Sequence, residues 1–159
     1  MEKTVRMSPV SRREFGRSLG LGLLAGASAC LFPGLASADA RLLDEAIKKV
    51  VGNKSLKPGK IKLDLPQIAE NGNTVPVTVS VDSPMTSNNH VKAVHLFADK
   101  NPRPEVATLH FSPSSGKASA STRMRMIKTQ NVVAVAELSD GTVHMSKAEV
   151  KVTIGGCGG

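Results

Sequence analysis

The chain has 159 residues and a formal net charge of +8, and it contains no tryptophan, no tyrosine and four phenylalanines. Proteins that bind single-stranded nucleic acid combine a basic groove with several aromatic side chains on which bases stack. The composition therefore argues against nucleic-acid binding, and we interpret the positive charge as solvated surface.

Residues 1–38 have the pattern of a secretory signal. Basic residues precede an apolar run from Leu19 to Phe32, and Ala36-Ser37-Ala38 then offers a cleavage site. The apolar run is shorter than the about 20 residues that a membrane-spanning helix needs, so we expect no stable membrane association. Arg12-Arg13, within the stretch SRREF, is a twin-arginine signature. The leader therefore predicts export to the periplasm by the twin-arginine pathway.

Cleavage after Ala38 leaves residues 39–159, which are enough for one domain with a hydrophobic core. Cleavage after Ala40 fits the pattern as well. A lipid anchor on Cys30 is a weaker alternative, because no leucine lies three residues before it. Cys30 leaves with the leader, so Cys157 remains as the mature chain's one cysteine. An internal disulfide is then excluded, and the leftover thiol indicates intermolecular pairing or reactivity.

A short helix is predicted over Asp39–Gly52. One apolar face recurs at helical spacing, formed by Leu43, Ala46, Ile47 and Val50. Asp39 is placed to cap the helix start and Gly52 to end it, with Lys48 and Lys49 near the negative end. We expect this helix to pack at the edge of the domain. The polar stretch 53–60, which contains Pro58-Gly59, reads as a connector.

After the connector, apolar residues alternate with polar ones, which is the pattern of strands with one buried face. The alternation is clearest in Val75–Val81, Ala107–Phe111 and Ala148–Ile154. Asn131–Leu138 is almost continuously apolar, as expected for a strand that is buried more completely. Asp140-Gly141 between two such runs predicts a tight β-hairpin.

About seven short strands separated by turn-forming residues predict an all-β, antiparallel β-sandwich with a short N-terminal helix. The mature chain lacks the cysteine pair and the tryptophan that pin antibody-type domains. We find no internal repeat and no second domain. We therefore assign residues 39–154 to one β-sandwich domain and residues 155–159 to a flexible C-terminal tail.

The tail reads Gly155-Gly156-Cys157-Gly158-Gly159. Glycine restricts the backbone least of all residues, so the four glycines favour a mobile arm around the thiol. Cys157 lies three residues beyond Ile154, and three extended residues span about 10 Å. The thiol can therefore leave the domain surface by that distance and enter a pocket of another protein.

Nothing along the tail activates the Cys157 thiol, whose ordinary pKa is about 8.5. Lys151 is the nearest basic residue in the sequence, six positions away. The negative charge of the terminal carboxylate favours the protonated thiol. We therefore predict that Cys157 is a handle modified inside partner proteins, that the chain is not itself an enzyme, and that it holds no cofactor.

Two alternatives remain open. A periplasmic copper-binding or thiol redox module would use Cys157 and His144 with nearby methionines, since soft ligands suit copper. A structural subunit would use Cys157 to crosslink chains. Core packing explains Met124 and Met126 better than copper does. The other histidines, at positions 90, 95 and 110, have no metal-like spacing, and we predict no metal site.

The ending VKVTIGGCGG (Val150–Gly159) resembles the C-terminus of the SoxY family, the Y subunit of the Sox sulfur-carrier complex. The resemblance runs through nearly the whole mature chain. Its other supporting stretches are PQIAENGNTVPVTVSVDSPMT from Pro66, NPRPEVATLHFSP from Asn101, SGKASASTRMRM from Ser115 and TQNVVAVAELSDGTV from Thr129.

The resemblance implies an immunoglobulin-like sandwich that forms a heterodimer with a Z subunit and carries sulfur intermediates during thiosulfate oxidation in the periplasm. Cys157 would be the site of covalent attachment, and Gly155, Gly156, Gly158 and Gly159 would form the arm. A c-type cytochrome complex would conjugate thiosulfate to Cys157, and a hydrolase would release sulfate. A sulfane dehydrogenase, in organisms that have one, would oxidise the remaining sulfur.

Overall fold

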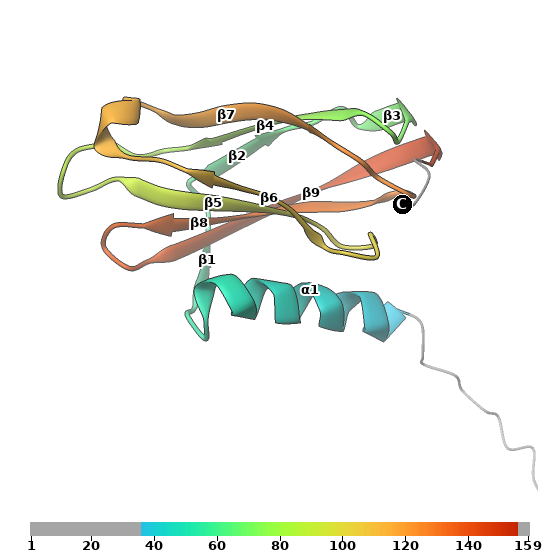
Figure 1. The fold of residues 1–159 in the computed structure, drawn as a ribbon, viewed down its shortest axis with the longest axis horizontal. Coiled ribbons are helices and arrows are strands. Elements are labelled where there is room, and N and C mark those ends of the chain that lie inside the picture. Colours follow the sequence, from blue (N-terminus) through green and yellow to red (C-terminus); the bar gives the residue numbers. More distant parts are fainter. Residues whose placement is uncertain (1–35, 156–159) are drawn as a thin grey trace, which may run out of the picture. The chain divides into compact units, whose positions relative to one another are not determined.

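Two β-sheets and one helix form three layers in the computed structural model, which describes residues 36–155 (Figure 1). In chain order the elements are α1 (Ala36–Val51), β1 (Leu56–Pro58), β2 (Ile61–Asp64), β3 (Ile68–Asn71), β4 (Val75–Val81), β5 (Val91–Ala98), β6 (Glu105–His110), a 3₁₀ turn (Pro113–Ser115), β7 (Ala118–Met124), β8 (Gln130–Leu138) and β9 (Val143–Ile154). The larger sheet has the order β1-β9-β8-β5-β6, with β3 also paired to β9, and the smaller sheet has the order β2-β4-β7. The predicted all-β sandwich with an N-terminal helix is confirmed, but the described residues form nine strands rather than about seven, and β1 and β3 pair with β9 in parallel rather than antiparallel.

Strand β9 pairs with every strand at one edge of the larger sheet. It pairs with β8 on one side, and on the other side β1 and β3 run parallel to successive parts of it. Leu56 opposes Val143, and Ile68 opposes Lys151. The prediction that residues 53–60 form only a connector was therefore wrong. The three residues of β1 form a strand because the fold brings the backbone of β9 beside them, which no local pattern signals.

The core between the two sheets is built from aliphatic side chains. The predicted alternation in β4 is confirmed, since its four valines at positions 75, 77, 79 and 81 are buried. They pack in one cluster with Val94 and Leu96 of β5 and with Val132 and Ala134 of β8. Burial of each such side chain contributes about 1.5–3 kcal/mol. This core therefore relies on many aliphatic side chains, many of them valines, rather than on large aromatic ones.

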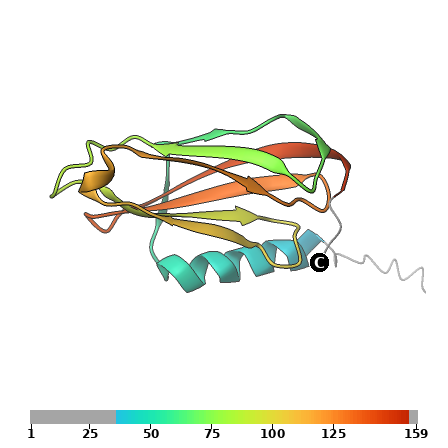
Figure 2. The same cartoon turned by 45° about the horizontal axis from the view of Figure 1, so that its top comes forward.

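Helix α1 lies on the outer face of the larger sheet rather than at the edge of the domain, which corrects the prediction (Figures 1 and 2). Its Ala46, Ile47 and Val51 pack on Phe97 of β5 and Val133 of β8. This second cluster explains why β8 is apolar almost throughout: the strand is covered by the smaller sheet on one face and by the helix on the other.

The ends of α1 differ in how well the sequence predicted them. The helix already begins at Ala36, so Asp39 lies in its first turn and does not cap its start. Gly52 ends the helix as predicted, with a φ of 68° and a hydrogen bond of 2.8 Å from its N–H to the Lys48 carbonyl. Positive φ values are open to glycine at little cost, which is why it ends helices in this way.

The predicted signal sequence lies outside the described residues as far as position 35. Its last three residues, Ala36-Ser37-Ala38, are the first residues of α1. Cleavage after Ala38 would therefore shorten the helix by those three residues. Within residues 36–155, no helix combines the length and the apolar character needed to cross a membrane.

The predicted hairpin joins β8 to β9. Gly141 has a φ of 83°, and the Leu138 N–H donates to the Thr142 carbonyl at 3.0 Å. Asp140 Oδ1 accepts hydrogen bonds from the Thr142 hydroxyl at 2.7 Å and from the Thr142 N–H at 2.8 Å. These two bonds, the side-chain bond first, hold the pKa of Asp140 below its ordinary value of 3.8.

Replacing Thr142 by Val removes the hydroxyl donor and keeps the N–H. We expect the pKa of Asp140 to rise toward its ordinary value, measured by an NMR titration of the Asp140 carboxyl carbon. Because folding lowers this pKa, the stabilisation is present above the ordinary pKa and is lost as pH falls through the folded value. Thr142→Ser, which keeps the hydroxyl, is the control. An equal pKa rise in both variants would contradict this assignment.

Candidate functional site

The C-terminal residues that the sequence singled out fall at the limit of the described chain. Cys157, Gly156, Gly158 and Gly159 lie outside it, and Gly155 is its last residue, directly after β9. The structure therefore describes the platform from which the tail leaves. We call this platform the arm root, and define it as Gly72, Met126, Ile127, Ile154 and Gly155.

Backbone hydrogen bonds hold the arm root from two directions. The Gly72 N–H donates to the Ile154 carbonyl at 2.8 Å, and the Met126 N–H donates to the Gly72 carbonyl at 2.7 Å. The Val152 N–H donates to the Thr129 hydroxyl at 2.9 Å. The end of β9 is therefore hydrogen-bonded to the turn after β3 and to the segment after β7. These hydrogen bonds hold the chain as far as Ile154, three residues before Cys157.

Gly155 passes close to the carbonyl group of Ile127. A Cβ added at position 155 would overlap the Ile127 oxygen and would lie 3.1 Å from its carbonyl carbon. Glycine is found where another part of the backbone approaches this closely. Sequence reasoning grouped Gly155 with the other tail glycines, because only the fold brings Ile127 to it.

Basic residues lie near the arm root in space although none lies near Cys157 in sequence. Arg125 and Lys128 flank the Met126-Ile127 pair that contacts Gly72 and Gly155. Lys128 Nζ lies 3.6 Å from Asp39 Oδ2, and both side chains are about half exposed. Such a surface pair contributes at most about 1 kcal/mol. Two basic residues therefore border the arm root in the sequence, and the charge of Lys128 is paired with that of Asp39.

The described residues proposed for a copper site are not brought together, and Cys157 lies outside the described chain. Met124 and Met126 are buried between the two sheets, whereas Met145 packs against the cluster under α1. His144 Nδ1 lies 3.4 Å from the Pro58 carbonyl oxygen. In the part of the chain that the structure describes, no three His, Cys, Asp or Glu side chains are grouped as a metal site would require. The prediction that the two core methionines serve packing is confirmed.

His95 is part of a polar cluster that the sequence analysis did not identify. Its Nδ1 lies 3.0 Å from the Thr108 hydroxyl, and its Nε2 lies 3.2 Å from Glu137 Oε1. Glu137 Oε2 accepts from Lys54 Nζ at 3.4 Å. The imidazole is almost completely buried, and both of its nitrogens are paired. This cluster links β5, β6 and β8 across the sheet face that also carries α1.

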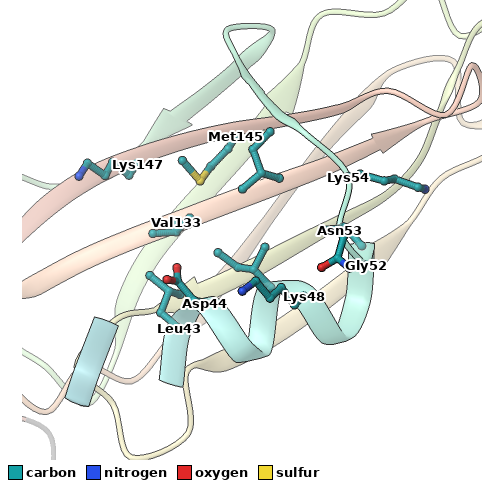
Figure 3. Close-up of a pocket in the computed structure, with 12 residues that line it drawn as sticks. Leu43, Asp44, Lys48, Gly52, Asn53, Lys54, Val133, Met145 and Lys147 are labelled. Atoms are coloured by element: carbon teal, nitrogen blue, oxygen red, sulfur yellow. The ribbon is translucent and has the colours of Figure 1, made fainter. Parts of the chain in front are cut away.

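A groove of about 360 Å³ lies between α1 and the larger sheet (Figure 3). Its apolar lining includes Leu43, Val133 and Met145. Three lysines and one aspartate also line it, namely Lys48, Lys54, Lys147 and Asp44. Lys48 and Lys147 form no ion pair with any described residue, whereas Lys54 pairs with Glu137. The groove thus combines an apolar surface with the unpaired charges of Lys48, Lys147 and Asp44, which sum to one positive charge.

Comparison with protein families matches residues 47–157 to the family described as sulfur oxidation protein SoxY. The chain belongs to the SoxY family. The match covers well over half of the chain and extends to Cys157. A comparison with curated proteins found no match.

Among solved structures, the sulfur carrier protein SoxY from Chlorobium limicola f thiosulfatophilum is similar, with a TM-score of 0.62 and 37% sequence identity. The similarity covers 72% of this chain and 99% of that one. It supports the immunoglobulin-like character predicted for the sandwich.

Superoxide reductases share the fold at much lower identity. The enzyme from Ignicoccus hospitalis has a TM-score of 0.53 at 16% identity, over 59% of this chain and 80% of that one. The enzyme from Nanoarchaeum equitans has a TM-score of 0.52 at 12% identity, over 60% of this chain and all of that one. At these identities the likeness concerns the fold alone. The SoxY assignment does not depend on it.

Proposed function

We propose that this SoxY family member carries sulfur intermediates of thiosulfate oxidation, bound covalently to the thiol of Cys157. The observation that carries the proposal is the family match, which extends through the glycine-flanked cysteine. The described structure supports it, because hydrogen bonds hold β9 as far as Ile154, and Gly155, two residues before Cys157, then passes close to Ile127. Two residues extend at most about 7 Å, so the thiol stays close to this root.

Loading is an oxidation that the chain does not carry out alone. Cys–SH and thiosulfate give Cys–S–S–SO₃⁻ with release of one proton and two electrons, and the c-type haem partner accepts the electrons. The bond formed is S–S, between the Cys157 sulfur and the outer sulfur of thiosulfate. Because the carrier supplies the thiol and the partner supplies the oxidant, the carrier needs no cofactor for this step.

Unloading proceeds by hydrolysis and further oxidation in other partners. Water cleaves the bond between sulfur and the sulfonate group, which releases sulfate and two protons and leaves Cys–S–S⁻. Where a sulfane dehydrogenase is present, three waters convert the terminal sulfur to a sulfonate with loss of six protons and six electrons. A second hydrolysis restores the thiol. A carrier that visits several enzymes in turn needs its cargo on an accessible, extended segment.

The proposal places the mature protein in the periplasm after removal of residues 1–38 by the twin-arginine route. Cys30 is lost with the leader, so Cys157 is the one cysteine of residues 39–159. The proposed partners are the Z subunit in a heterodimer, the c-type cytochrome complex, the sulfate-releasing hydrolase and, where present, the sulfane dehydrogenase.

Intact-mass measurement of the protein purified from thiosulfate-grown cells tests the function. We expect a population whose mass exceeds that of the mature chain by one S₂O₃ unit or by added sulfur atoms, localised to Cys157 by peptide mapping. Reduction should restore the unmodified mass. Finding Cys157 free in all molecules, or present only as a disulfide between two chains in cells, would count against carriage.

We assign the groove beside α1 to the stable Z partner. Lys147, the groove residue of β9 nearest to the arm root, and Ile154 lie seven residues apart, which corresponds to about 23 Å along the strand. A partner bound in the groove would therefore leave the arm root open to the enzymes. The unpaired Lys48 and Lys147 favour a partner surface that presents apolar side chains with carboxylates beside them.

Reversing both unpaired charges tests this assignment. We expect Lys48→Glu/Lys147→Glu to weaken the heterodimer about tenfold at low ionic strength, with a smaller effect in high salt, measured by titration calorimetry. The control is Lys62→Glu/Lys117→Glu, which changes the net charge equally at exposed positions outside the groove. An equal loss of affinity in both variants would show that the groove is not the docking surface.

A further inference from the structure

Gly155 differs from the other glycines of the tail, because its contact with Ile127 leaves no room for a side chain. An alanine Cβ at position 155 would overlap a backbone oxygen, and ordinary Cβ contacts are longer than the 3.1 Å to the Ile127 carbonyl carbon. A flexible side chain could move away from such a contact. A backbone carbonyl moves only if its segment moves.

The segment that carries this carbonyl is held by the side chain of Asn101. The Ile127 N–H donates to Asn101 Oδ1 at 3.3 Å, and Asn101 Nδ2 donates to the Arg125 carbonyl at 2.8 Å. Gln130 Nε2 donates to the same Asn101 oxygen at 2.8 Å. Asn101 therefore bonds the backbone on both sides of Met126, which is itself fully buried.

Gln130 extends this support into the interior. It has no exposed surface, and its Oε1 accepts from the Lys100 N–H at 2.8 Å. Displacing it would leave buried polar groups without partners, which is unfavourable, so this arrangement resists displacement. A side chain at position 155 would consequently push the tail away rather than move the Ile127 carbonyl.

The opposite side of the tail is equally constrained. Ile154 is held by Gly72, and the Thr153 hydroxyl donates to the Glu70 carbonyl at 2.9 Å. Gly155 thus leaves a fixed strand and passes a fixed carbonyl, which determines the direction in which the chain continues.

We propose that Gly155 is a positioning residue: its close approach to Ile127, held by Asn101 and Gln130, sets the direction in which Cys157 is presented to the enzymes that load and unload it. In this proposal, glycine is needed at position 155 because a side chain there would collide with Ile127, and not because it makes the tail flexible. The inference rests on the proposed carrier function, since presentation matters only if partner enzymes act on Cys157.

Gly155→Ala and Gly156→Ala in the full chain, assembled with its partner subunit, form the matched pair. Both add one methyl group to the tail. We expect Gly155→Ala to lower kcat/KM for thiosulfate conjugation by the haem partner roughly tenfold to a hundredfold, because a displacement of about 1 Å can cost that much. Gly156→Ala should stay within about threefold. Alkylation of Cys157 by iodoacetamide should be unchanged in both, since a small reagent needs no particular direction of approach.

NMR provides a readout that does not depend on the enzymes. Gly155→Ala should shift the amide signals of Gly72, Ile127 and Thr129, and Gly156→Ala should not. Asn101→Ala, which frees the Ile127 carbonyl without touching the tail, should lessen the effect of Gly155→Ala in the double variant. If Gly155→Ala fails to fold, Asn101→Ala alone remains informative, because it should lower enzymatic loading and leave alkylation unchanged.

Equal loading and equal amide spectra for the two glycine variants would overturn the inference, as would full additivity with Asn101→Ala. Failure of the carrier function has a different signature. Wild-type protein would then take up no thiosulfate sulfur, although Cys157 would still react with iodoacetamide. The amide shifts would still report whether the Gly155→Ala substitution displaces the arm root.

Discussion

Replacing Cys157 by Ser is expected to abolish sulfur loading completely while the domain folds and still binds its partner. A serine hydroxyl cannot form the S–S bond that attaches thiosulfate, so no residual loading should remain. The residue lies in the sequence beyond the last described hydrogen bond of β9, so we expect the substitution to change stability by no more than about 0.5 kcal/mol. Intact-mass measurement after incubation with thiosulfate and the haem partner gives the result directly.

The chain supplies its own control for this variant. Cys30→Ser removes the other cysteine, which we place in the cleaved leader, so the exported protein should be loaded like the wild type. Loading that survives in Cys157→Ser would refute attachment at Cys157. Loss of loading in Cys30→Ser from exported protein would refute the processing scheme.

Replacing Phe97 by Ala is expected to reduce the free energy of unfolding by about 3–5 kcal/mol. Phe97 is 1% exposed and lies between α1 and the larger sheet, with its ring centroid 6.5 Å from that of His95. Truncation leaves a cavity that the small neighbours Ala46 and Val133 cannot fill. Since domains are stable by about 5–15 kcal/mol, this is a large fraction of the total.

Phe111→Ala is the matched control, because Phe111 is only partly buried at the periphery of the other cluster. Urea unfolding followed by circular dichroism should show a much lower midpoint for Phe97→Ala than for Phe111→Ala at similar slope. Equal midpoints would mean that the contact between helix and sheet contributes little to stability.

Local patterns were sufficient for the strands that carry their own hydrophobic signal. The alternation in β4 and the apolar run of β8 follow from side-chain periodicity, and the Asp140-Gly141 hairpin follows from the positive φ that glycine accepts. β1 and β3 carry no such signal. They are strands because β9, far along the chain, offers them backbone partners.

The position of α1 shows the same limit. Its apolar face, at Ala46 and Ile47, was readable from helical spacing, but the surface that it covers was not. An amphipathic pattern states that a face must be buried and does not state against what. Expecting the helix at the edge was wrong because the outer face of the larger sheet, around Phe97 and Val133, is itself apolar and needs cover.

The sequence by itself determined the fold class, the hairpin and the family, and it singled out Cys157, because those depend on local periodicity, glycine conformation and residue identity. The tertiary structure alone decided that Ile127 meets Gly155 and that Asn101 and Gln130 hold that contact. These contacts join positions more than 20 residues apart. They arise from how β3, β7 and β9 pack, which no local pattern encodes.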